Sequence, residues 1–204
     1  MTRKKQSGSL QIVRHYAFEE TSGTEFFDLN GVNKLTLSAG NISTITTTDS
    51  FSGNAVKFTA TAQIPIEPYS SDFTFRDANG NKPFDIEYYA KDLIGSSRRI
   101  PVRIGNSNPV IFCDVNANIL KLIIYKQDGT NFGVQMTYPV NSSIYRKFLF
   151  QYRPGQTPMI LINDVAQITT NFGTEGDIKI ATPDLLIGGL EREGYMDEFK
   201  LRIG

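Results

Sequence analysis

The sequence is poor in several residue types: its 204 residues include no tryptophan, one cysteine and one histidine. It also lacks a net charge, because 21 basic residues balance 21 acidic ones, and this balance excludes a global attraction to nucleic acid or anionic lipid. No apolar run approaches the ~20 residues that a helix needs to cross a bilayer. No apolar signal-peptide segment follows the polar, basic N-terminus, so we expect neither a membrane partner nor secretion by that route.

The single cysteine and the single histidine offer little for catalysis. Cys113 lies in the apolar run 110–113, where we expect a small buried side chain rather than a reactive thiol. It cannot form an internal disulfide, which suits a protein that folds in a reducing cytoplasm. His15 lies within an alternating segment, and no nucleophile motif accompanies either residue.

What the sequence does contain is a succession of short segments that alternate between apolar and polar residues, the pattern of half-buried β-strands. The clearest ones span residues 84–91, 119–126 and 147–152, and turn-forming pairs such as Pro154-Gly155 and Asn163-Asp164 separate them. We predict an all-β domain of about twelve short strands without an amphipathic helix, in a sandwich or barrel.

The C-terminal segment 194–203 shows the longest alternation. Its pattern predicts a strand whose apolar face carries Tyr195, Phe199, Leu201 and Ile203. Asp197 falls on the same face, where an unpaired carboxylate would cost several kcal/mol, roughly. We therefore predict that Asp197 is a buried structural carboxylate that accepts hydrogen bonds from nearby backbone N–H groups.

Several segments resemble, in the same order, those of the laminin-G-like, concanavalin-A-like lectin and glucanase jelly rolls: Tyr16-Ala17-Phe18, Asp28-Leu29-Asn30-Gly31, residues 51–58, 84–90 and 148–165, Ile187-Gly188-Gly189, and the closing segment 194–203. The resemblance covers residues 10–204. It implies a two-sheet antiparallel jelly-roll sandwich in which the first strand, near residues 11–18, pairs with the last. The family often has a tryptophan before the strand at 148–152, and its absence here weakens an inherited role in stacking on sugars.

Some relatives in this family are glucanases with an E-x-D-x-x-E strand that supplies paired carboxylates. The best match here is Asp85 with Glu87, but Pro83 and Ala90 occupy the other carboxylate positions. We therefore predict no enzyme activity and no catalytic residue, and expect Asp85 and Glu87 on the solvent-facing side of a strand.

Jelly rolls of this kind sometimes bind calcium on a rim loop, which requires clustered oxygen ligands. Three groups have suitable residues: Asp77, Asn79 and Asn81; Asp114, Asn116 and Asn118; and Glu191, Glu193 and Asp197. None matches an EF-hand loop, and Asp and Asn are also common in ordinary turns. We expect no metal site and no cofactor, with calcium at the first or second group as the alternative.

Residues 1–9 form a separate arm in our interpretation, with Arg3, Lys4 and Lys5 followed by a flexible Ser-Gly-Ser sequence. A short charged arm can be flexible when free and ordered when bound. We predict that these three residues bind a partner, and that residues 10–204 form one jelly-roll domain.

These features predict a non-enzymatic structural or interaction protein. The lone jelly roll with a basic arm suggests a bacteriophage virion protein, made in the host cytoplasm, that docks on other virion subunits as a capsid decoration or tail-attached component. The alternative is a carbohydrate-binding module or adhesin that recognises surface glycans. A short cluster of Arg98, Arg99 and Arg103 near two tyrosines is interpreted as a charged edge rather than a nucleic-acid site.

Overall fold

The computed structural model describes residues 9–37, 46–58, 65–68, 70–91, 102–105, 109–116, 118–138, 144–181, 183–188 and 194–204. The predicted partner-binding residues Arg3, Lys4 and Lys5 lie outside these ranges, as do Arg98, Arg99, Glu191 and Glu193. Within the described residues the chain forms strands and turns without a helix, so none of their segments is a helix able to cross a membrane.

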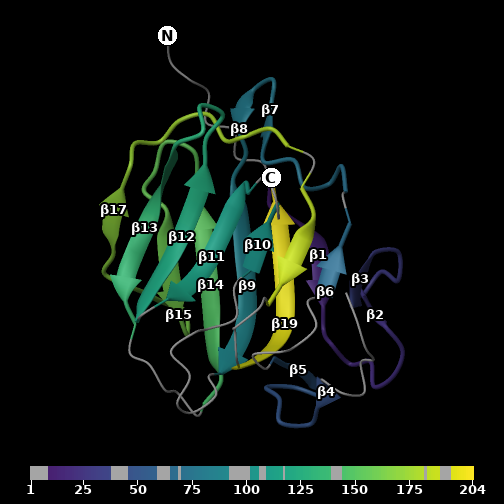
Figure 1. Cartoon of the computed structure of the whole chain (residues 1–204). Coiled ribbons are helices and arrows are strands. Elements are labelled where there is room, and N and C mark those ends of the chain that lie inside the picture. Colours follow the sequence, from purple (N-terminus) through teal and green to yellow (C-terminus); the bar gives the residue numbers. More distant parts are fainter. Residues whose placement is uncertain are drawn as a thin grey trace.

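Two large antiparallel sheets face one another in a sandwich (Figure 1). The eight-stranded sheet has the order β16 (Val165–Ala166), β15 (Met159–Ile162), β14 (Arg146–Tyr152), β9 (Phe84–Lys91), β19 (Gly194–Ile203), β5 (Ala55–Phe58) and β4 (Thr46–Thr47), with β1 (Gln11–Tyr16) also paired to β19. The nine-stranded sheet has the order β17 (Thr170–Phe172), β13 (Asn131–Thr137), β12 (Ile119–Tyr125), β11 (Ile111–Asn116), β10 (Val102–Ile104), β18 (Leu185–Ile187), β6 (Pro65–Glu67), β3 (Lys34–Leu37) and β2 (Glu25–Phe27). A separate hairpin consists of β7 (Arg76–Asp77) and β8 (Gly80–Asn81).

This architecture confirms the predicted all-β, two-sheet antiparallel jelly roll. The structure has more strands than the twelve expected, because several contain only two or three residues and are too short for their alternation to be recognised. The hairpin between β15 and β16 turns at Asn163 and Asp164, whose φ angles of 52° and 64° are those of a tight type I′ turn.

The closing strand β19 organises the eight-stranded sheet. One of its edges pairs with β9, and the other pairs first with β5 and then with β1. The register of the last pairing runs from Gln11 opposite Ile203 to Tyr16 opposite Phe199, which confirms that the first strand pairs with the last.

A bulge in β19 corrects the predicted alternation of this strand. The register with β9 shifts between Asp197 and Lys200, and Glu198 adopts a φ of 52°. Before the bulge Met196 is buried in the core, so Tyr195 lies on the opposite, outer face rather than with Phe199. The extra residue resets the pattern, which a strict period of two could not predict.

The core lies between the two sheets and is rich in aromatic residues. Phe84, Ile86 and Tyr88 of β9 belong to the same buried cluster as Leu120 and Leu122 of β12, in the opposite sheet. Cys113 is fully buried in this cluster, and its burial raises the pKa of the thiol. The cysteine is therefore a small core residue, as expected from its apolar neighbours.

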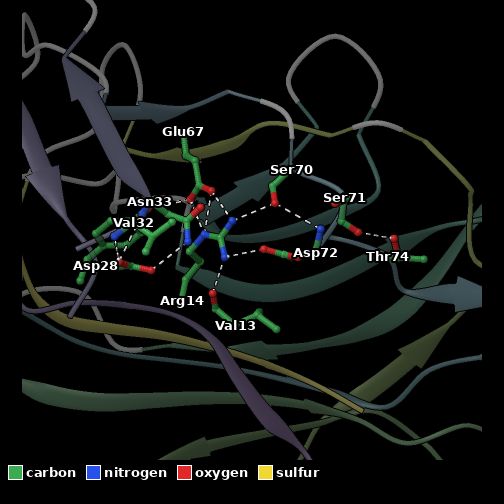
Figure 2. Close-up of polar contacts among 11 residues, drawn as sticks. Val13, Arg14, Asp28, Val32, Asn33, Glu67, Ser70, Ser71, Asp72 and Thr74 are labelled. Carbon is green, nitrogen blue, oxygen red and sulfur yellow. Dashed lines mark hydrogen bonds and ion pairs between the residues drawn. The ribbon is translucent and has the colours of Figure 1, made fainter. Parts of the chain in front are cut away.

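A buried ion pair connects the two sheets (Figure 2). The register of β1 shifts between Ile12 and Arg14, so that Arg14 points inward and is only 1% exposed. Its Nη2 lies 2.6 Å from Oε1 of Glu67 on β6, and its Nη1 lies 3.0 Å from Oδ2 of Asp72. The hydroxyl of Tyr16 donates to Glu67 Oε2 at 2.6 Å, so strand β1 is tied to β6 by two neighbouring side chains. Arg14 and Glu67 are both buried, which indicates a structural role for this ion pair.

Candidate functional site

A pocket of about 240 Å³ lies at one side of the sandwich, where edges of the two sheets approach each other. Figure 1 shows β13 and β17 in front, with β14 and β15 behind them. The turn between β14 and β15 forms one wall, and β13, β17 and the segment that follows β17 form the other. The lining residues are Phe132, Gly133, Gly155, Gln156, Thr157, Pro158, Asn171, Phe172, Gly173 and Glu175.

Glycine lets the strands approach closely at the base of this pocket. Gly133 of β13 pairs with Phe172 of β17 on one side and with Ile123 of β12 on the other. A Cβ atom at Gly133 would lie 1.9 Å from the carbonyl oxygen of Leu122 and 3.0 Å from Cζ of Phe172. Any side chain at this position would therefore push the backbone away and disturb the pocket wall that Phe172 forms.

Glu175 is held rigidly at the pocket. Its Oε1 accepts a 2.6 Å hydrogen bond from the hydroxyl of Tyr152 and a 3.0 Å bond from the backbone N–H of Gly155. Its Oε2 lies 3.1 Å from the same N–H. Burial and the hydrogen bond to Glu175 raise the pKa of Tyr152, so the hydroxyl stays protonated and acts as a donor.

The hairpin β7–β8 also positions this region through Asn81. The side-chain amide of Asn81 donates to the Tyr152 hydroxyl at 3.0 Å and to the carbonyl of Gly176 at 2.8 Å, and its Oδ1 accepts the N–H of Ile178 at 2.8 Å. The chain on either side of Glu175 is thus positioned by hydrogen bonds at Gly155, Gly176 and Ile178. A preorganised polar group of this kind loses little conformational entropy when a ligand binds.

The rest of the lining combines free polar side chains with aromatic surface. Within the described part of the chain, the side chains of Gln156, Thr157 and Asn171 form no hydrogen bond, and all three residues are exposed. Phe132 is buried and Phe172 is half buried. Amides, a hydroxyl and a carboxylate beside the ring of Phe172 can bind a small ligand that has both hydroxyl groups and an apolar face.

In the first possible calcium group, the side chains of Asp77 and Asn81 already form other hydrogen bonds. Asp77 Oδ1 accepts the backbone N–H of Asn79 at 2.7 Å, as in an ordinary turn. Asn81 uses its amide to hold the segment after Glu175, and is therefore not free to act as a ligand. The described residues contain no cluster of three His, Cys, Asp or Glu side chains that could hold a metal ion.

Asp85 and Glu87 lie on the outer face of the eight-stranded sheet, but they are not solvated as predicted. They are only 6% and 8% exposed. Asp85 Oδ1 lies 2.7 Å from Nη1 of Arg153, and Glu87 Oε2 lies 3.1 Å from Nη1 of Arg202, with Lys147 Nζ at 3.8 Å. Flanking basic side chains cover both carboxylates, a burial that their own strand pattern could not predict.

Asp197 also lies on this outer face, because it pairs with Tyr89 of β9, an outward-facing residue. This corrects its predicted place on the apolar face. Asp197 is nevertheless completely buried, and its Oδ2 accepts backbone hydrogen bonds from Phe51 at 3.0 Å and Ser52 at 2.8 Å. The loop before β5 covers it, and the ring of Phe51 stacks on Tyr89 with centroids 3.8 Å apart.

Three tyrosines lie near Asp197 on the outer face, but each ring already contacts another side chain. Phe51 covers Tyr89, and Nζ of Lys91 lies 4.5 Å from the ring centre of Tyr195 and 5.4 Å from that of Tyr145. These internal contacts make the group a poorer platform for a sugar than the pocket beside Glu175.

Two smaller sequence candidates have structural roles. Tyr88 is buried in the core, so it cannot join Arg103 in a nucleic-acid surface. Arg103 instead lies 4.7 Å from the ring centre of Phe112. His15 is half buried on the outer face, with Nε2 2.6 Å from Oε2 of Glu198.

Sequence reasoning missed Glu175 and its pocket. The only signal was the turn at Pro154-Gly155, which does not indicate that the segment after β17 approaches it. The pocket depends on contacts such as that between Gly155, in the turn between β14 and β15, and Glu175, in the segment after β17. These segments meet only in the folded chain.

No family model and no curated protein matches this sequence. Solved structures do match its fold. The receptor-binding domain of botulinum neurotoxin D superimposes with a TM-score of 0.68 at 9% identity, covering 93% of this chain and 48% of the other. The binding domain of Paraclostridial Mosquitocidal Protein 1 gives a TM-score of 0.65 at 14% identity, with the same coverage. A botulinum neurotoxin D ligand-binding domain solved with N-acetylneuraminic acid gives 0.69 at 7%, covering 93% and 47%.

The chain spans about half the length of these solved chains. At such low identity the likeness concerns the fold. It supports a lectin-like β-sandwich, but it singles out neither the laminin-G family nor a virion protein. The fold of this chain is therefore the β-sandwich found in these toxin binding domains.

Proposed function

We propose that this chain is a non-catalytic binding domain that recognises carbohydrate. The observation that carries the proposal is the pocket in which the anchored carboxylate of Glu175 lies beside the free amides of Gln156 and Asn171 and the ring of Phe172. Hydroxyl groups of a sugar can donate to the carboxylate and exchange hydrogen bonds with the amides, while its C–H face packs on the ring. The volume of about 240 Å³ lies below the ~300–1,000 Å³ of pockets for drug-sized ligands, so it suits one terminal sugar unit.

The same residues support binding rather than hydrolysis. Retaining glycoside hydrolysis needs two carboxylates about 5–5.5 Å apart. Among the described lining residues Glu175 is the single carboxylate. Asp85 and Glu87 are engaged by Arg153 and Arg202, and a carboxylate paired in this way is a poor general acid.

The fold neighbours add support of a weaker kind. They are binding domains, and one was solved with N-acetylneuraminic acid. This chain matches only about half of each neighbour, so the N-acetylneuraminic acid of that neighbour is not assigned to the half that this chain resembles. The carbohydrate proposal for this chain therefore rests on its own pocket.

The test is a glycan array probed with the intact protein, followed by titration of the best ligands by calorimetry. We expect selective binding that Asn171→Ala weakens at least about tenfold, because the change removes an exposed amide from the pocket. Asn30→Ala is the matched control, since Asn30 is an exposed turn residue outside the pocket. No binding to any glycan, or equal loss in both variants, would contradict the proposal. We expect no release of sugars from any bound polymer.

A second proposal rests on the sequence of the arm. We propose that Arg3, Lys4 and Lys5 attach the domain to an acidic surface of another subunit in a phage particle, with the sandwich facing outward. Deletion of residues 2–8 removes no described core residue, so the sandwich should fold while incorporation into the particle is lost. High salt should weaken attachment of the intact protein. Normal occupancy of the truncated protein on the particle would contradict this proposal.

A further inference from the structure

We infer that the pocket selects neutral saccharides over anionic ones, and that Glu175 is the residue that makes this selection. The inference rests on the proposed carbohydrate-binding function and names the class of sugar that the site takes. It also distinguishes this chain from the neighbour solved with N-acetylneuraminic acid, which is an acidic sugar.

The charge of the pocket is the first argument. Glu175 is the only charged side chain among the described lining residues, and the ion pairs of the described chain do not include it. Tyr152 donates a hydrogen bond but stays neutral, so the charge of Glu175 is oriented without being cancelled. A carboxylate or sulfate on a bound sugar would meet this negative charge without a counter-ion in the described lining. Glu175 is exposed to water, so the repulsion at about 4 Å is of the order of 1 kcal/mol, enough for a preference of several-fold to about tenfold.

The unused acceptor capacity of Glu175 is the second argument. A carboxylate has about four lone-pair sites. Among the described residues, Oε1 receives two hydrogen bonds, from Tyr152 and Gly155, whereas Oε2 receives one, at 3.1 Å from the backbone N–H of Gly155. The remaining capacity of Oε2 fits O–H donors, and a hydrogen bond to a charged acceptor is stronger than one between neutral groups. A neutral sugar supplies such donors, which an ionised acidic group does not.

The side chains of Gln156 and Asn171 are compatible with a preference for neutral sugars. Their amides are uncharged and carry both donors and acceptors, so they can bind hydroxyl groups but cannot neutralise an anion. The amides can therefore bind a neutral sugar, and the carboxylate of Glu175 is the one described lining group that discriminates by charge.

The experiment compares matched probes that differ in one acidic group: lactose with 3′-sialyllactose, and neutral with uronic-acid-terminated oligosaccharides. We expect the wild-type protein to bind the neutral member of each recognised pair several-fold to about tenfold more tightly. Glu175→Gln should reduce this preference to less than about threefold, because glutamine can still accept from Tyr152 and Gly155 but carries no charge. The preference of the wild type should also shrink as salt increases.

Two further variants make the result specific. Glu25→Gln is the matched control, because it removes one negative charge on β2, outside the pocket, and should leave the preference unchanged. Thr157→Lys adds a positive charge at an exposed lining position and should shift the preference toward the anionic probe even if Glu175→Gln folds poorly.

The outcomes separate the two proposals. Equal or tighter binding of the anionic probes by the wild type would overturn this inference and leave carbohydrate binding intact. An unchanged preference in folded Glu175→Gln and in Thr157→Lys would overturn the role of Glu175. Failure of the wild type to bind any glycan of the array would overturn the proposed function itself.

Discussion

The carboxylate of Asp197 accepts a 2.8 Å hydrogen bond from the backbone N–H of Ser52, and so joins the bulge in the last strand to the loop before β5. The two residues are far apart in the sequence, but β19 and β5 are neighbours in the eight-stranded sheet. A second hydrogen bond, from the N–H of Phe51, holds the same loop over the sheet. These two bonds offset part of the cost of burying the carboxylate, whose Oδ1 is buried without a hydrogen-bond partner among the described residues.

Replacing Asp197 tests this contact. Asp197→Ala should lower the free energy of unfolding by ~1–3 kcal/mol, the range for buried donors that lose their acceptor. Asp197→Asn should cost less, because its amide oxygen can still accept from Phe51 and Ser52. Urea unfolding followed by circular dichroism measures both changes, and a loss below ~0.5 kcal/mol for alanine would show that these bonds contribute little.

The same residue should make stability depend on pH. Burial raises the pKa of Asp197 to about 6, the nearby charge of Glu198 adds to this, and the hydrogen bonds from Ser52 and Phe51 oppose it. Since this pKa exceeds the value of 3.8 for an unperturbed aspartate, the folded protein holds the proton more tightly. The contribution to stability is therefore fully present below pH ~4 and is lost as the pH rises through about 6.

Comparison with Asp197→Asn isolates this effect from other titrating groups. The free energy of unfolding of the wild type minus that of the variant should increase as the pH falls from 7 to 4. The slope for one proton cannot exceed ~1.4 kcal/mol per pH unit. A difference that is flat or that decreases toward low pH would contradict the assignment.

The buried pair of Arg14 and Glu67 should be costly to break. Arg14→Met should destabilise the fold by ~3–5 kcal/mol, because Glu67 would remain buried without its cation. The double variant Arg14→Met with Glu67→Met should lose less than the sum of the two single changes. Lys34→Met breaks the partly exposed pair with Glu25 and serves as the control, with an expected loss of ~0.2–1 kcal/mol. Additive losses for Arg14 and Glu67 would show that the two side chains act independently.

A side chain at Gly133 should disturb both the sheet and the pocket. Gly133→Ala should destabilise by ~1–3 kcal/mol through the clash with the carbonyl of Leu122, and should also weaken ligand binding by displacing Phe172. Gly129 has a φ of 83°, but a Cβ there would meet no atom within 4 Å. Gly129→Ala should therefore cost only its backbone strain, ~1 kcal/mol, and should not affect the pocket. Equal effects of the two changes on thermal unfolding would rule out the clash.

Much of the fold could be predicted because its signals are local. The alternation in 84–91 and 119–126 reflects one core-facing apolar side per strand, and Asn163-Asp164 tolerates the positive φ of a tight turn. The pairing of the first strand with the last followed from the resemblance in segment order. The places where prediction failed are the bulges in β1 and β19, since one inserted residue moves every following side chain to the other face.

The candidate site was predicted less well, for a related reason. Arg14 and Tyr16 lie two residues apart in one strand and so share a face, but the acceptor Glu67 is on a strand of the other sheet, which no local pattern indicates. Glu175 lies in a segment without a recognisable motif, and its partners Tyr152 and Gly155 come from another part of the chain. Local pattern carries no information about such distant neighbours.

The sequence by itself determined the all-β class, the positions of the main strands and turns, and the burial of residues such as Cys113, because each depends on nearest neighbours and on the period of a strand. Only the tertiary structure decided which face Asp197 occupies, which cations cover Asp85 and Glu87, and where Glu175 meets the free amides of a pocket. Those features depend on the register between strands and on the meeting of two sheet edges, and both are set by packing of the whole core.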